Sequence, residues 1–164
     1  MEPNPHILRH HHITLSVGTA QEDYDFHTQV LGLKSVKKTA LYDGDEPRFG
    51  ERMLCFSHPC GIGYAMVAID DDNRRPYSNG HIPAEFGIRG THGITVSLRD
   101  ADSSDEFMQY GWSGKQRRVD GNCIRYKVGS GGSGCIIDFL LEPNLPQGSW
   151  AYGEGVVHHC AFKV

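Results

Sequence analysis

The sequence has few cysteines, and they follow no pattern that is typical of a structural site. The five cysteines are odd in number and include no Cys-x-x-Cys pair. A disulfide framework is therefore not expected, and the cysteines are predicted to be buried or free thiols. These residues are Cys55, Cys60, Cys123, Cys135 and Cys160.

Long apolar runs and a strong charge bias are also missing. No stretch is long and apolar enough for a membrane helix or for the apolar region of a signal peptide, so we expect a cytoplasmic protein. The formal net charge of -4 gives no reason to expect binding to nucleic acid or to a membrane. With 164 residues, the chain is long enough for one domain with a proper core or for two small modules.

A short segment with the character of a strand occurs three times, at residues 11–17, 92–98 and 158–164. The three copies read HHITLSV, HGITVSL and HHCAFKV. Internal repetition of this kind indicates that each copy opens one supersecondary unit.

The repeats place two histidines at equivalent positions. His12 and His159 take the second position of the first and last copies, and Gly93 takes it in the middle copy. Because strand side chains alternate between faces, His12 and Thr14 share the polar face, away from the core. Two such imidazoles and a carboxylate are typical of a non-haem Fe(II) site. The alternative interpretation is that they are ordinary, partly exposed histidines.

The first two repeats each open a β-α-β-β-β succession. The first succession is predicted to have a helix capped by Thr19, then a turn at 43–45. Its helix is predicted at 20–31, and its strands at 11–17, 33–42, 48–57 and 63–69. In the second, Phe107, Met108 and Tyr110 are expected to face inward from the helix, and 129–134 is expected to be a flexible turn. Its helix is predicted at 102–111, and its strands at 91–98, 116–119, 123–128 and 135–141.

These successions predict an α+β fold of tandem βαβββ modules. The first module covers residues 8–70, a polar connector 71–87, and the second module 88–143. Residues 144–164 form a linker and the opening strand of an incomplete further module. That last strand must pair with another module, pair with a second copy of the chain, or remain an exposed edge. Exchange between two copies would give a homodimer.

Three stretches carry a resemblance to a known family. They are HHIT with GTAQ at 11–14 and 18–21, IPAEF with IRGTHG at 82–86 and 88–93, and LPQGSW with VHH at 145–150 and 157–159. With the paired modules, they make the chain resemble the vicinal oxygen chelate superfamily of glyoxalases and extradiol dioxygenases. Within it, the chain resembles ring-cleaving dioxygenases that act on hydroquinones. The resemblance covers most of the chain outside residues 45–80 and implies modules that form a curved mixed sheet.

The resemblance implies a site for Fe(II) or Mn(II), a small aromatic substrate and dioxygen. Two metal ligands correspond to His12 and His159, and the third to a Glu on the last strand of the final module. His158 corresponds to a residue beside the substrate that helps to move its proton. Thr14 corresponds to a hydroxyl that lines the pocket.

The chain differs from that family's pattern in two respects. First, one of the family's four modules has no counterpart in this chain. Second, the final module stops after its opening strand, so the Glu that serves as the third ligand in the family has no counterpart in this chain. Glu142, at the end of the second module, is the candidate substitute, and His92 is a further candidate although Gly93 occupies the ligand position. The alternative function is a metal-free module of the same fold that binds small molecules. A third interpretation is an incomplete polypeptide that needs a partner to supply the missing strands.

Overall fold

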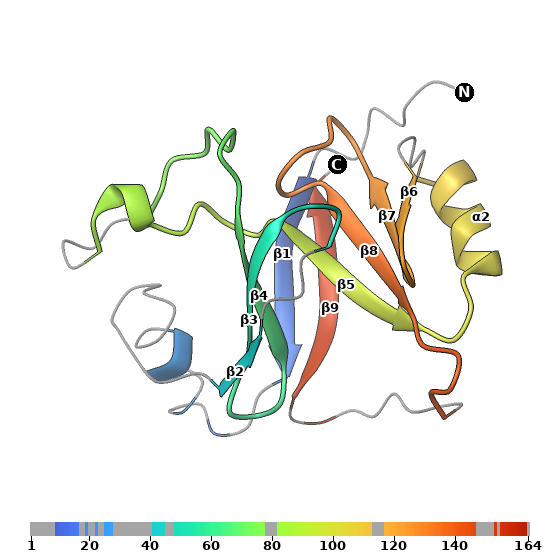
Figure 1. Ribbon diagram of the computed structural model, residues 1–164, viewed down its shortest axis with the longest axis horizontal. Coiled ribbons are helices and arrows are strands. Elements are labelled where there is room, and N and C mark those ends of the chain that lie inside the picture. The colour runs from blue at the N-terminus through green and yellow to red at the C-terminus, as the bar shows by residue number, and fades with distance from the viewer. Residues whose placement is uncertain are drawn as a thin grey trace. The chain divides into compact units, whose positions relative to one another are not determined.

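In the computed structural model, the described residues form three sheets (Figure 1). It describes residues 9–16, 19, 22, 25–27, 41–44, 48–77, 82–112, 117–146, 153 and 155–163, and for 9–16 and 41–44 it describes the backbone. The chain divides into two compact units. We call residues 1–13, 91–150 and 160–164 the four-stranded unit, and residues 14–90 and 151–159 the three-stranded unit. No helix among the described residues is long and apolar enough to cross a membrane.

The four-stranded unit has the predicted β-α-β-β-β order. Its elements are β5 (Gly93–Leu98), α2 (Asp102–Tyr110), β6 (Arg118–Asp120), β7 (Cys123–Lys127) and β8 (Ile136–Leu141). The sheet order is β5-β8-β7-β6, in which β5 and β8 are parallel and the other two pairs are antiparallel. The sheet is therefore mixed, and the prediction of an α+β fold is confirmed.

One face of this sheet is buried against α2, which lies beside it in Figure 1. Alternation along β7 and β8 places four large apolar side chains on that face. Met108 of α2 packs on them and is 3% exposed. The buried cluster comprises Ala101, Met108, Ile124, Tyr126, Val128, Cys135, Ile137 and Phe139.

The face that α2 turns toward the sheet differs from the prediction. Met108 is buried as expected, but Phe107 and Tyr110 are 56% and 65% exposed. The inward stripe follows helical spacing from Ala101 through Asp105 to Met108. Asp105 belongs to this stripe because its carboxylate accepts a hydrogen bond from the buried Tyr126 hydroxyl. The prediction considered only apolar residues as inward-facing, and it therefore missed a face that contains the carboxylate of Asp105.

Replacing Tyr126 by phenylalanine is expected to lower the free energy of unfolding by about 1–3 kcal/mol at neutral pH, because Asp105 loses a hydrogen bond. Burial and the Asp105 carboxylate raise the pKa of Tyr126 from 10.0 to about 12. The folded chain thus holds the phenolic proton more tightly, and this stability is complete below pH 10 and lost as the pH rises through about 12. Urea unfolding from pH 8 to 12 measures the loss.

The matched control is Tyr110→Phe, because the Tyr110 side chain is exposed. This variant should unfold like the parent at every pH. A Tyr126→Phe variant that loses as much stability as the parent between pH 10 and 12 would contradict the assignment.

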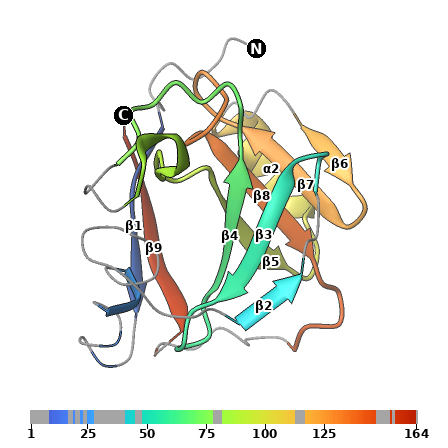
Figure 2. The same cartoon turned by 60° about the vertical axis from the view of Figure 1, so that its left-hand side comes forward.

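The three-stranded unit is an antiparallel meander of β2 (Leu41–Gly44), β3 (Arg52–Ser57) and β4 (Gly63–Ala68), drawn in Figure 2. The prediction of a turn at 43–45 is wrong for Asp43 and Gly44. Both lie in β2, because the ladder continues across an irregularity and pairs Gly44 with Cys55.

The third predicted strand begins later than expected. Phe49 and Gly50 have φ values of 56° and 76° and form a turn, so β3 starts at Arg52 and excludes Arg48. Residues 22 and 25–27 are helical, as predicted for the helix at 20–31. The rest of that helix and residues 33–40 of the next predicted strand lie outside the described residues.

The first and last strands, β1 (Arg9–Ser16) and β9 (Val156–Lys163), form a two-stranded sheet. Their ribbons lie side by side in both views (Figures 1 and 2). Three outcomes were left open for the last strand, and the structure shows one of them: the strand pairs with β1 of the same chain. Phe162 of β9 packs edge-to-face on Trp112 with ring centroids 4.6 Å apart, and this contact anchors the last residues of β9, which belong to the four-stranded unit. A homodimer formed by exchange of the C-terminal strand between two copies stays a prediction.

The glycine-rich run at 129–134 is a hydrogen-bonded turn. Val128 N donates to Cys135 O at 2.9 Å, and Gly131 N donates to Val128 O at 3.0 Å. Four of its glycines have φ between 54° and 90°, a region that disfavours residues with a Cβ. The glycines therefore allow a defined turn conformation, whereas the sequence alone predicted a flexible turn.

Candidate active site

Two exposed histidines are adjacent on β9. Nδ1 of His158 lies 2.8 Å from Nδ1 of His159, and the two rings meet edge-to-face. At this distance one Nδ1 donates a hydrogen and the other accepts it. The donating ring then has its lone pair on Nε2, and the accepting ring carries a hydrogen there. While both rings are neutral, only one of them can offer Nε2 to a metal or to a proton.

The structure brings the strands of His12 and His159 into one sheet. His12 and Thr14 lie on β1, and β1 pairs with β9. The side chains of His12 and Thr14 lie outside what the structure describes. Convergence of the two imidazoles therefore stays a prediction.

Glu142 follows β8 directly and is tied to the end of β5. One carboxylate oxygen, Oε2, accepts a hydrogen bond from the Ser97 hydroxyl. The backbone N–H of Glu142 donates to the Leu98 carbonyl at 2.7 Å. These two bonds fix the position of the carboxylate that the sequence selected as the third ligand.

His92 precedes β5 and takes part in a different set of contacts. Its Nδ1 lies 2.9 Å from the Ser133 hydroxyl, and its carbonyl accepts from Gly134 N at 2.8 Å. Both bonds connect the start of β5 to the glycine-rich turn. They give His92 a structural role in the four-stranded unit.

The donor types on these strands suit a metal such as Fe(II) or Mn(II). Imidazoles and a carboxylate form the facial ligand set of non-haem iron. A metal-bound histidine usually makes a hydrogen bond through its second ring nitrogen, and the Nδ1 contact of His159 supplies such a bond. Within the part of the chain whose side chains are described, no group of three His, Cys, Asp or Glu residues is placed to hold a metal.

A buried ion pair lies on the sheet face opposite α2. Arg125 of β7 faces Asp138 of β8 in register, and its Nε and Nη2 each donate to one carboxylate oxygen at 2.8 Å. The two side chains are 4% and 9% exposed. Thr95 is opposite Asp138 on β5, and alternation places the buried Ile136 and Cys123 on the same face, so the ion pair lies among apolar side chains. No local pattern in the sequence indicates Arg125, because its partner is 13 residues away and only the strand register brings the two together.

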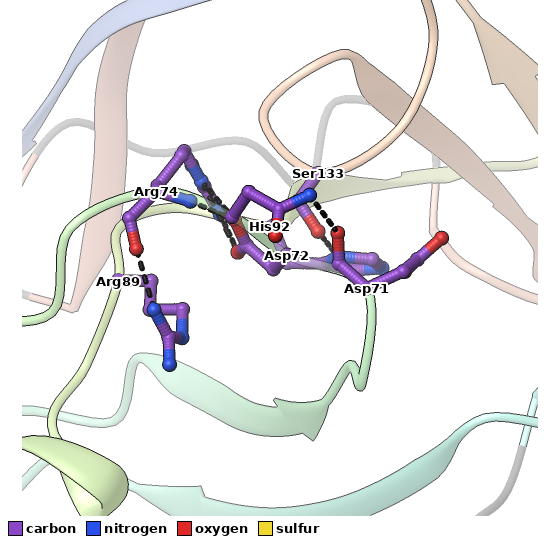
Figure 3. Close-up of polar contacts among 7 residues, drawn as sticks. Asp71, Asp72, Arg74, Arg89, His92 and Ser133 are labelled. Carbon is purple, nitrogen blue, oxygen red and sulfur yellow. Dashed lines mark hydrogen bonds and ion pairs between the residues drawn. The ribbon is translucent and has the colours of Figure 1, made fainter.

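A second polar network organises the connector (Figure 3). The guanidinium of Arg74 donates to both oxygens of Asp72, at 2.9 Å from Nε and 2.7 Å from Nη2. Arg89 in turn donates from Nη1 to the Arg74 carbonyl at 2.6 Å. The sequence predicted only a polar connector here, but the Asp72 side chain is 9% exposed. The network thus connects Asp72 and Arg74, which precede the 3-10 helix at Ala84–Phe86, to Arg89, which follows it.

Replacing Asp72 by asparagine should destabilise the three-stranded unit. Hydrogen bonds from Arg74 lower the pKa of Asp72 from 3.8 to about 2, against the opposing effect of burial. This stability is present above pH 3.8 and lost as the pH falls through about 2. The shift corresponds to about 2 kcal/mol at pH 7. Urea unfolding of parent and variant at pH 7 and pH 2 measures it, and an equal difference at both pH values would contradict the assignment.

Comparisons with known proteins give two related sequences. The chain is 29% identical to a chlorohydroquinone/hydroquinone 1,2-dioxygenase of Sphingobium indicum, over 94% of this chain and 70% of that protein. It is 23% identical to MhqO of Bacillus subtilis, which is named as a ring-cleaving dioxygenase, over 93% of this chain and 68% of that protein. No protein-family model matches the chain.

The fold has a counterpart among solved structures. A Bacillus subtilis crystal structure described as that of a dioxygenase superposes with a TM-score of 0.78 and 21% identity, over 95% of this chain and 70% of that one. The alignment with the Sphingobium protein spans 223 positions, which is more than the 164 residues of this chain. It therefore has gaps opposite segments that only the relative contains.

Proposed function

From its relationship to dioxygenases of the glyoxalase/extradiol type, we propose that this chain opens the ring of hydroquinone- or catechol-like phenols with dioxygen, in the cytoplasm. The observation that carries the proposal is the exposed histidine pair on β9, the partner strand of β1. These histidines were selected from the sequence, and β9, on which they lie, pairs with β1, the strand of His12.

The proposed metal ligands are His12, His159 and Glu142, for Fe(II) or Mn(II). When bound, the metal would acidify the phenol and allow electrons to pass to dioxygen. Ser97 supports this set by holding one oxygen of Glu142 through a hydrogen bond, which leaves the second oxygen for the ligand role.

The histidine pair decides which proton each ring carries. If His159 binds through Nε2, its Nδ1–H donates to Nδ1 of His158, so that His158 presents an Nε2–H. We assign this N–H to the phenolate oxygen of the substrate, to which it donates. To accept the substrate's proton at Nε2 instead, His158 must release the contact with His159. Thr14, on β1, is assigned to the wall of the same pocket.

Oxygen consumption by the purified full-length chain tests the function. The chain is loaded with Fe(II) or with Mn(II) under nitrogen and then mixed with hydroquinone, chlorohydroquinone or catechol in aerated buffer. The proposal predicts one dioxygen consumed per phenol and a product that contains both oxygen atoms. Binding of these phenols with no oxygen consumption under either metal would overturn it in favour of a metal-free binding module.

A further inference from the structure

The loop between β3 and β4 holds a cysteine against a histidine. Nδ1 of His58 lies 2.6 Å from Sγ of Cys60. His58 is buried, with 3% of its surface exposed, and Cys60 is half-buried. Both residues belong to the three-stranded unit. Neither has a role in the proposed ring cleavage.

The backbone determines which atom carries the hydrogen. The Cys60 N–H donates to Nδ1 of His58 at 3.1 Å. Because a backbone amide can only donate, Nδ1 must present a lone pair, and a neutral His58 carries its hydrogen on Nε2. Nδ1 is thus the ring atom that can accept the thiol hydrogen of Cys60, in competition with the amide hydrogen that it already receives.

The loop keeps the imidazole in this orientation. His58 N donates to Ile62 O at 2.7 Å, and Gly61 N donates to His58 O at 2.8 Å. The His58 ring packs edge-to-face on Phe26, with centroids 4.0 Å apart. A nucleophile with a fixed neighbouring base is the arrangement that activates cysteine in thiol chemistry.

We propose that Cys60 is a nucleophilic thiol with His58 as its proton acceptor, and that it takes carbonyl-conjugated alkenes, of which quinones are the relevant class. The sulfur attacks a ring carbon of the quinone while Nδ1 of His58 accepts the thiol proton, and the Cys60 N–H gives up its bond to Nδ1 in this step. A C–S bond forms, and the electron pair of the attacked C=C bond moves to the carbonyl oxygen. That oxygen then takes a proton from His58, and the ring carbon passes its hydrogen to the second oxygen. The product is a hydroquinone thioether, and no external oxidant is required.

Quinones form when hydroquinones lose two electrons, so their presence beside this protein rests on the proposed function. The reactivity of the thiol does not. The backbone of the loop also touches Gly155, since a Cβ at that position would lie 2.1 Å from the Cys60 carbonyl. The thiol therefore belongs to a turn that packs against the residue preceding β9.

Competitive labelling of the full-length chain tests the inference. N-ethylmaleimide or 1,4-benzoquinone is added below one equivalent at pH 7, and modified peptides are quantified by mass spectrometry. Cys60 should react about tenfold faster than Cys55 or Cys160, which are also half-buried. Burial raises the pKa of Cys160 and makes it the slowest of the three. Equal labelling of Cys60 and Cys55 in the parent chain would overturn the inference.

Two variants isolate the role of His58. His58→Gln should slow labelling of Cys60 to the rate of Cys55, and Cys55→Ser should leave Cys60 labelling unchanged. Because His58 is buried, the circular dichroism of the His58→Gln variant is first compared with that of the parent. If the variant does not fold, the ratio of Cys60 to Cys55 labelling in the parent decides whether the inference holds. Selective labelling without oxygen consumption would reject the proposed function alone, and oxygen consumption with unselective labelling would reject this inference alone.

Discussion

Replacing His159 by alanine is expected to reduce the proposed ring cleavage at least about a thousandfold, because several kcal/mol of transition-state stabilisation would depend on the proposed metal. The variant should also lose stoichiometric iron. Its fold should be retained, since His159 is exposed and the anchoring contact of β9 is made by Phe162. Iron content per chain and the initial rate of oxygen consumption measure the two effects.

His92→Gln is the control for this experiment. His92 begins the middle copy of the repeated strand, and the sequence made it a further candidate for a metal ligand. Its bonds to the glycine-rich turn favour a structural role, so its variant should keep iron and oxygen consumption. If His92→Gln lost iron while His159→Ala retained it, the ligand assignment would be wrong.

The β-α-β-β-β order was predictable because it depends on local patterns. Alternation along 123–128 and 135–141 determines the buried face of β7 and β8, and these strands end within one residue of the prediction. The inward face of α2 was not predictable in the same way. Asp105 lies inside because of Tyr126, which comes 21 residues later, and an apolar pattern contains no information on that bond. The module boundaries at 70, 87 and 143 stay predictions.

The candidate site shows the same division between local and distant determinants. The repeated strand identified His12 and His159 as equivalent, because repetition is visible in the sequence itself. Pairing of β1 with β9 joins residues at opposite ends of the chain, and no local preference selects it among the alternatives. Arg125 and Asp138 were missed for a related reason, since a one-residue change of register would separate them.

Replacing Arg125 by methionine is expected to lower the free energy of unfolding by about 3–5 kcal/mol. The variant leaves the Asp138 carboxylate 9% exposed and without its bidentate partner. A buried charge that loses its counter-charge costs more than the pair itself contributes, because its desolvation is no longer offset. Urea unfolding at pH 7 measures the loss.

Two further variants distinguish the loss of a partner from the loss of packing. Arg125→Met combined with Asp138→Leu should recover most of the stability, because it removes both buried charges and keeps the apolar volume. Arg52→Met should change the stability little, since Arg52 and Asp70 are 78% and 97% exposed and 3.7 Å apart, so water already solvates both charges. A double variant as unstable as Arg125→Met would mean that the stability depends on packing by the Arg125 side chain, and the loss could then not be assigned to the unpaired charge of Asp138.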